Sequence, residues 1–168
     1  MSLSMHQMFV PVTTRALSNL AAVLKKGQAW AADQQVDDAV MLGTRLIPNM
    51  LPLSKQVQIA TDMAKNGAAR LAGVEPIPFE DNETDFGQLL ARLERAIEIL
   101  TAFTPEQLEG SETRSVVLKL RSGELNFQGL DYVQNFVLPN VFFHCTTAYN
   151  ILRQAGVPLG KMDFLGGV

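Results

Sequence analysis

Apolar residues recur at three- and four-residue spacing over four long stretches of the chain, a pattern that predicts amphipathic helices. The four stretches are residues 5–32, 49–72, 84–103 and 130–154. Gly73, Pro105 and Gly156 stand just beyond the last three of them, where helix breakers are expected. A shorter helix is expected from Asp37 to Leu46. Four long helices predict a four-helix bundle.

A different period appears between Arg114 and Gln128, where apolar and polar residues alternate. Alternation places successive side chains on opposite faces, as in a β-strand. A tight turn at Ser122 and Gly123 would join two strands and pair Leu118 with Phe127. We therefore expect a mainly α fold, a four-helix bundle with one short β-hairpin before the last helix.

Composition and charge narrow the class of protein. Hydrophobic residues make up 47% of the 168 residues and charged residues 18%, which excludes a disordered chain and suits a single domain over residues 1–168. With 14 basic and 17 acidic residues the net charge is −3, which argues against a nucleic-acid-binding surface. The single cysteine, Cys145, excludes an intrachain disulfide and a cysteine zinc cluster. We see neither a secretory signal nor a membrane-spanning stretch, so we expect a cytoplasmic protein.

Two of the predicted helices carry polar residues inside an apolar stripe. On the last helix, His144 lies at the middle of the stripe and Asn140 lies one turn before it. On the second helix, Gln56 lies near the centre of the apolar side, with Asn49 two turns earlier. The opposite, solvent-facing side of that helix is expected to carry Lys55, Gln58, Asp62, Lys65 and Asn66.

Four inward polar groups need partners, because each costs about 1–3 kcal/mol when it is buried and unpaired. Three interpretations stay open at this point. The groups form a satisfied hydrogen-bond network, they line a pocket for a ligand or metal, or the helices are rotated differently from the pattern.

Several runs along the chain are similar to those of a known family, and together they cover nearly its whole length. The runs are Arg45–Leu53 (RLIPNMLPL), Gln56–Ala60 (QVQIA), Gly73–Glu75 (GVE), Leu138–His144 (LPNVFFH), Thr146–Arg153 (TTAYNILR) and Lys161–Gly166 (KMDFLG). They resemble an uncharacterised bacterial domain-of-unknown-function family within the DinB/YfiT-like metalloenzymes. The resemblance implies a four-helix bundle that pairs as a homodimer. Better-understood relatives include metal-dependent thiol transferases and isomerases that act with low-molecular-weight thiols.

The resemblance also implies where a metal would be held, and this chain departs from that pattern. In the metal-binding relatives, one histidine of the second helix joins a His-x-x-x-His pair on the last helix. Here His144 matches the first histidine of the pair, but Ala148 follows four residues later and Gln56 takes the second-helix position. One imidazole with the amides of Gln56 and Asn140 is a poor site for zinc or nickel. We therefore expect a degenerate metal site and no cofactor, with a divalent ion on His144 as the remaining alternative.

Two functions follow from these residues. The favoured one is a ligand-binding or structural module with a polar pocket around His144, because amides bind and orient ligands but transfer protons poorly. The residues expected to contact the ligand are Arg45, Asn49, Gln56, Asn140, His144 and Tyr149. The alternative is an enzyme acting on small molecules or thiol conjugates, with His144 as the base or the sole imidazole ligand. Phe142 and Phe143 face different ways, so one of them is expected to meet a second copy of the chain.

Overall fold

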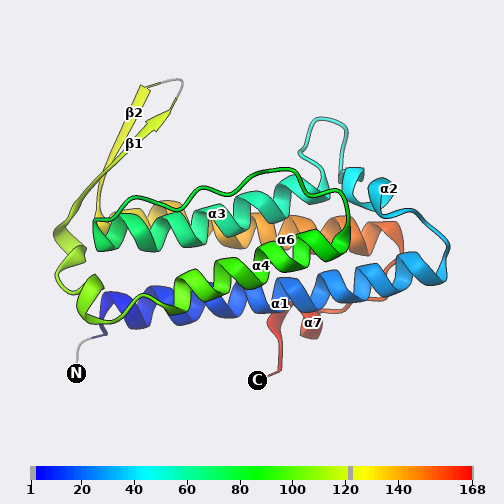
Figure 1. Ribbon diagram of the computed structural model, residues 1–168, viewed down its shortest axis with the longest axis horizontal. Coiled ribbons are helices and arrows are strands. Elements are labelled where there is room, and N and C mark those ends of the chain that lie inside the picture. Colours follow the sequence, from blue (N-terminus) through cyan, green and yellow to red (C-terminus); the bar gives the residue numbers. More distant parts are fainter. Residues whose placement is uncertain (1–2, 121–122, 168) are drawn as a thin grey trace.

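The computed structural model describes residues 3–120 and 123–167, and it confirms a mainly helical bundle with one hairpin before the last helix (Figure 1). The four long helices are α1 (Met5–Asp33), α3 (Leu53–Ala72), α4 (Phe86–Thr101) and α6 (Leu138–Ala155). The shorter elements are α2 (Asp38–Gly43), two 3-10 turns (Glu106–Leu108 and Ser111–Thr113), β1 (Ser115–Leu120), β2 (Gly123–Gln128), α5 (Gly129–Asp131), a π-helical turn (Tyr132–Val137) and α7 (Lys161–Leu165). Across the described ranges, no helix is both long and apolar enough to cross a membrane.

Local sequence fixes the start of α1. The Ser4 hydroxyl accepts a hydrogen bond from the Gln7 amide, and the Gln7 side chain accepts one from the Ser4 amide, each at 3.1 Å. This capping box satisfies two of the backbone N–H groups that a helix leaves free at its N-terminus. Pro11 lies inside one continuous helix that runs to Asp33.

The start of α3 differs from the expectation. The helix begins at Leu53, four residues later than the apolar pattern indicated, and Asn49 lies in the preceding loop. Pro48 and Pro52 explain the difference, because the residue before a proline avoids the helical conformation. At the other end, Gly73 adopts a left-handed conformation (φ 73°) and closes the helix as expected.

The segment between α3 and α4, residues 73–85, returns along the length of the bundle. In Figure 1, α3 and α4 run in the same direction, so this crossover segment must cover the length of α3 before α4 can begin. A helix of 20 residues is about 30 Å long, and the 13 residues of the segment reach about 43 Å when extended, so the segment is long enough. It covers a side of α3 that we expected to face solvent.

The crossover segment buries part of the side of α3 that we expected to face solvent, so that prediction is wrong for Gln58 and Lys65. Gln58 and Lys65 are only 3% and 2% exposed. The Lys65 ammonium donates to the Ile77 carbonyl at 2.6 Å and lies 4.3 Å from the centre of the Phe79 ring. Burial lowers the pKa of Lys65, and the neighbouring Asp62 opposes that shift.

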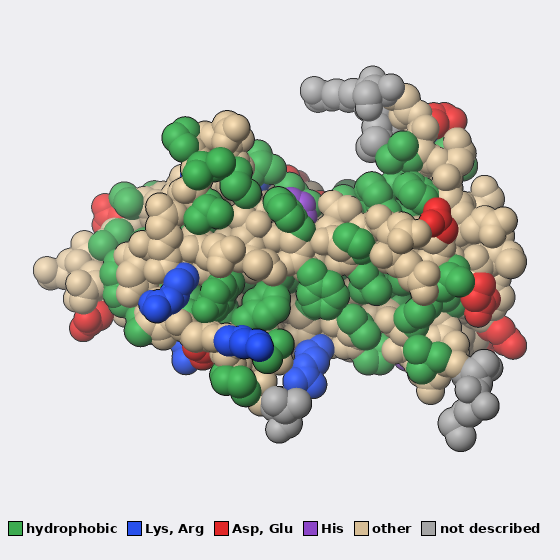
Figure 2. Space-filling view, turned by 180° about the vertical axis from the view of Figure 1, so that it is seen from behind, with side chains coloured by type: hydrophobic (Ala, Val, Ile, Leu, Met, Phe, Trp, Pro, Cys, Tyr) green, Lys and Arg blue, Asp and Glu red, His purple; other side chains and the backbone are tan. Residues whose placement is uncertain are grey.

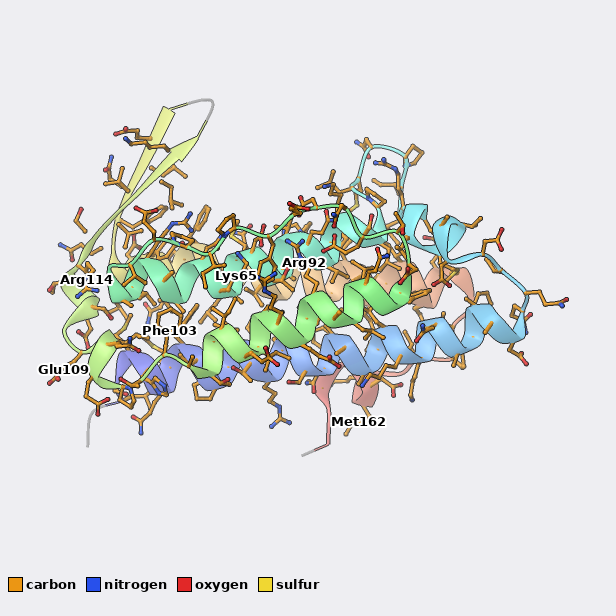
Figure 3. All side chains as sticks on the ribbon, in the orientation of Figure 1. Lys65, Arg92, Phe103, Glu109, Arg114 and Met162 are labelled. Carbon is orange, nitrogen blue, oxygen red and sulfur yellow. The ribbon has the colours of Figure 1, made fainter. Side chains whose placement is uncertain are left out.

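Arg92 of α4 fastens the crossover segment to the bundle (Figure 3). Its side chain is buried, and its acceptors come from α3 and from the crossover. Nε donates to Thr61 Oγ1 at 2.8 Å, Nη1 to the Glu80 carbonyl at 3.0 Å and to Glu83 Oε1 at 2.8 Å, and Nη2 to Asp62 Oδ1 at 3.0 Å. The guanidinium is thus paired with charged and neutral acceptors together, as a buried charge requires.

The hairpin forms where the alternating pattern predicted it, but in a different register. Leu118 pairs with Leu125 and Val116 with Phe127, so the register is shifted by two residues from the expected pairing of Leu118 with Phe127. A shift of this kind leaves every side chain on the same face, so the apolar pattern could not detect it. Ser122 of the expected turn lies outside the described residues, as does Arg121 beside it.

The last helical segment changes from a π-helical turn to a regular α-helix just before Pro139. A π-helical turn from Tyr132 to Val137 precedes α6, and Pro139 stands in the first turn of α6. The Asn140 side chain donates to the Phe136 carbonyl at 2.7 Å. Proline has no backbone N–H to donate, so in a regular α-helix it would leave the Asn135 carbonyl, four residues earlier, without its donor; the Asn140 side-chain bond adds a donor beside this junction.

Candidate functional site

Gln56 of α3 and His144 of α6 face each other between the two helices. His144 Nδ1 lies 2.7 Å from Gln56 Oε1, and the two residues are 8% and 1% exposed. Helices α3 and α6 pack against each other, and this pair is a polar contact within that packing. The prediction that both side chains point inward is confirmed.

The orientation of the Gln56 amide fixes the protonation of the ring. Gln56 Nε2 donates to the Leu51 carbonyl at 2.9 Å, which places the amide oxygen toward His144. The reverse orientation would set two oxygen atoms against each other at Leu51. Nδ1 of His144 therefore carries the proton and donates it, and Nε2 keeps its lone pair as an acceptor.

The environment keeps this ring neutral. Burial lowers the pKa of His144 below its ordinary value, because a charged imidazolium would lose its hydration between the helices. The Phe143 ring meets the imidazole edge-on, with centroids 5.2 Å apart. A neutral imidazole with one free lone pair can accept a hydrogen bond or take up a proton.

The loop between α2 and α3 holds the pair in place. Arg45 Nη1 donates to the Met50 carbonyl at 2.5 Å, next to the Leu51 carbonyl that orients Gln56. Arg45 therefore reaches the pair indirectly, through the loop backbone. Asn49 lies on the same loop with its side chain exposed, so the expected position two turns before Gln56 on the helix is wrong.

The other two predicted residues lie apart from the pair. Asn140 is half-buried one turn before His144, and its amide is bound to its own helix. The Tyr149 ring meets the Phe164 ring edge-on at 6.0 Å, so it faces the C-terminal segment. Of the six residues, the structure brings Gln56 and His144 into contact, and ligand contact by any of them stays a prediction.

A groove of about 750 Å³ lies beneath the hairpin, between β1 and α3. Its floor includes Ile59, Met63, Asn66 and Arg70, which follow Gln56 at three- and four-residue spacing and so share its face of α3. Neither Gln56 nor His144 lines the groove, which begins one turn away at Ile59.

Arg70 and Tyr132 form a second polar pair at the hairpin end of this groove, which our sequence reasoning missed. Arg70 Nη1 lies 3.0 Å from the Tyr132 hydroxyl, and burial raises the pKa of that phenol, so it stays neutral. The spacing of 14 residues between Gln56 and Arg70, two heptads, is the signal that could have revealed the common face.

The donors at His144 do not fit the centre that the relatives use. One imidazole nitrogen faces one amide oxygen, and that nitrogen, Nδ1, is protonated. Within the described ranges, no three His, Cys, Asp or Glu side chains come together in a way that could hold a metal ion. Zinc and nickel sites are built from several thiolate, imidazole or carboxylate ligands, and this pair supplies a single free imidazole nitrogen.

Comparisons with known proteins agree with this architecture. The crystal structure of a DinB family member protein from Shewanella denitrificans is similar to this chain with a TM-score of 0.91 and 34% sequence identity, over 97% of this chain and 92% of that one. No curated protein matches. The model of the family described as "Domain of unknown function (DUF1993)" matches residues 5–165. The chain therefore belongs to the DUF1993 family and has a DinB-like fold.

Proposed function

We propose that this protein binds a small organic ligand along the α3–α6 face, and that its metal centre has been replaced by a hydrogen-bonding pair. The observation that carries the proposal is the 2.7 Å contact between His144 Nδ1 and Gln56 Oε1. The resemblance assigns metal ligands to these two positions. An amide oxygen that already accepts a hydrogen bond from the ring N–H supports a hydrogen-bonding role for the pair instead of metal binding.

The chemistry of the pair selects the ligand. His144 Nε2 is an acceptor, so the ligand carries an O–H, N–H or S–H donor that bonds to it. The rest of the ligand would extend one turn along α3 from the pair into the groove, whose lining there includes Ile59 and Met63. Arg70, at the hairpin end, suits a polar or anionic group. The groove lining mixes apolar residues with polar and charged ones, Asp62, Asn66, Glu75 and Lys119 among them, so it suits a ligand that is polar along part of its length.

The free lone pair of Nε2 also supports the alternative of an enzyme, in which His144 takes a proton from the bound donor group. Burial lowers the pKa of His144, which weakens it as a base while keeping it unprotonated at neutral pH. Binding without turnover is therefore the favoured function. If the wild type and His144→Ala convert thiol conjugates at equal rates, His144 is not catalytic and the binding function remains. If conversion is lost in His144→Ala, the enzyme alternative is favoured.

The metal question is tested first, on untagged protein. We expect elemental analysis to find no stoichiometric metal, and calorimetric titration with zinc and nickel to give the same heat for the wild type and His144→Ala. Stoichiometric metal that disappears in His144→Ala would overturn the proposal, because the ring would then act as a ligand.

Ligand binding is tested by NMR of histidine-labelled protein with phenol, benzyl mercaptan and benzamide as donor probes. The chain has two histidines, and His6 Nε2 lies 3.0 Å from the Phe103 carbonyl, which gives an internal reference. We expect the donors to move the His144 ring signals in a saturable way and to leave those of His6 unchanged. Anisole, which lacks a donor, should have no effect on either ring.

Two variants separate binding from general disturbance. Gln56→Met removes the acceptor of Nδ1 and should abolish the selectivity for donors, whereas the same change at the exposed Gln154 of α6, Gln154→Met, should leave it intact. If donor probes and anisole act alike on the wild-type ring, the proposed recognition through Nε2 is wrong.

A further inference from the structure

A second hollow lies on another side of α6, between α1, α6 and the segment that contains α7. We call it the C-terminal cavity. Its volume is about 190 Å³, and its lining includes Ala16, Leu20, Val23, Phe142, Cys145 and Phe164. Cys145 follows His144, so its side chain points about 100° around the helix from the ring. The C-terminal cavity is therefore separate from the groove under the hairpin.

The chain's own C-terminal segment forms one wall. Figure 1 shows α7 beside α1, where it is held by polar bonds to that helix. Arg15 donates to the carbonyls of Leu165 at 3.2 Å and Gly167 at 3.1 Å, and Asn19 donates to the Phe164 carbonyl at 3.1 Å. Lys26 pairs with Asp163 at 2.5 Å. The tethered segment thereby adds a wall to a hollow that stays partly open to solvent, since Val12 and Phe142 of its lining are 36% and 39% exposed.

The interior of the C-terminal cavity is poorly suited to water. A buried water needs two to four polar partners. The polar side chains at this cavity, Arg15 and Asn19, already donate to backbone carbonyls of the C-terminal segment. Burial raises the pKa of the Cys145 thiol to about 12, so this group stays neutral and behaves as a small apolar side chain.

We propose that the C-terminal cavity is a binding site for one small, neutral, apolar molecule, such as a substituted benzene or a short alkyl compound. An apolar cavity of about 150 Å³ stays dry and accepts benzene, and the C-terminal cavity is somewhat larger at about 190 Å³. The one charged lining residue, Arg15, is exposed and donates to two carbonyls of the C-terminal segment, and the other lining residues are apolar apart from the neutral Asn19. The proposal is independent of the function proposed for His144.

Toluene is the probe, and the full chain is titrated with it by calorimetry and by methyl NMR. Ala16→Leu places a larger side chain into the cavity, and Ala22→Leu makes the same change on the exposed side of α1. We expect saturable toluene binding to the wild type and to Ala22→Leu, and at least a tenfold weaker affinity for Ala16→Leu. Methyl signals of Leu20 and Val23 should shift, and the His144 ring signals should not.

A second variant protects the test against misfolding of Ala16→Leu. Phe164→Ala enlarges the C-terminal cavity and should shift the preference from toluene toward naphthalene, while a circular dichroism spectrum like that of the wild type shows that the bundle is intact. The proposal is overturned if toluene does not bind, or if Ala16→Leu and Ala22→Leu bind it equally. It is also overturned if Ala16→Leu changes the oligomeric state and toluene has no effect, since a second copy of the chain would then occupy the site.

Discussion

Replacement of Arg92 by leucine should destabilise the protein more than any other single surface or boundary substitution on α4. Arg92 donates to Glu83 Oε1 at 2.8 Å and to Asp62 Oδ1 at 3.0 Å, and the Glu83 side chain is only 8% exposed. Removing one partner of a buried ion pair costs about 3–5 kcal/mol, because the other charge stays buried without compensation. A natural domain has a total stability of about 5–15 kcal/mol, so this loss is a large fraction of it.

Urea unfolding followed by circular dichroism measures the effect. With an m-value of about 2–3 kcal/mol/M, the midpoint should fall by about 1–2 M. Arg95→Leu is the matched control, because Arg95 lies on the same helix and over the same Phe79 ring, 4.7 Å from its centre, but its side chain is exposed. We expect that variant to change stability by less than about 0.5 kcal/mol.

The source of the loss can be separated with a double variant. If the unpaired Glu83 carboxylate is responsible, Arg92→Leu combined with Glu83→Gln should recover part of the lost stability. Equal midpoints for Arg92→Leu and Arg95→Leu would refute the reasoning, since the crossover segment would then be held by its apolar contacts alone.

Three further predictions concern other parts of the molecule. Burial lowers the pKa of His144 in the folded protein, so the unfolded chain takes up a proton first as the pH falls through about 6.5. The free energy of unfolding should therefore decrease below that pH. In urea titrations between pH 7 and 5, His144→Gln should flatten this decrease. The Cys145 thiol, with its pKa raised to about 12, should react with iodoacetamide at pH 8 at least about a hundredfold more slowly in the native protein than in urea. The back face carries many hydrophobic side chains (Figure 2), and Phe143 is 55% exposed on α6; we expect a homodimer that Phe143→Glu converts to a monomer in light scattering. A wild-type mass near that of one chain at micromolar concentration would contradict the last of these.

The parts of the fold that periodicity controls could be predicted from the sequence. The four long helices, the capping box at Ser4, the stop at Gly73 and the hairpin follow from local rules, and the structure has them. The burial of Gln58 and Lys65 could not be predicted in this way. Periodicity identifies the face that packs on other helices, but it does not show where an irregular segment will return across the opposite face.

In the candidate site, too, some residues could be predicted from the sequence pattern and others could not. Gln56 and His144 could be found because each is a polar residue at the centre of an apolar stripe, and their contact follows from the packing of α3 on α6. Asn49 was misplaced because Pro52 delays the start of the helix. The Arg70–Tyr132 pair joins two elements 62 residues apart, and only the tertiary arrangement brings them together.

A gain of metal binding would be the strongest support for the idea that the pair at Gln56 occupies a former metal centre. The double variant Gln56→His with Ala148→His would restore one histidine on α3 and a His-x-x-x-His pair on α6, whose members share one helix face. Gln56 Oε1 lies 2.7 Å from His144 Nδ1, and two nitrogen ligands at about 2.0–2.1 Å from zinc stand only slightly further apart, so a small side-chain movement suffices. Ala148 is fully buried, so the added imidazole also costs packing energy. The fold of the double variant must therefore be checked by circular dichroism.

We expect the folded double variant to hold about one zinc ion per chain by elemental analysis, and Gln56→His alone to hold far less. A folded double variant without zinc would mean that these three positions do not converge, and the proposed descent of the pair from a metal centre would be wrong.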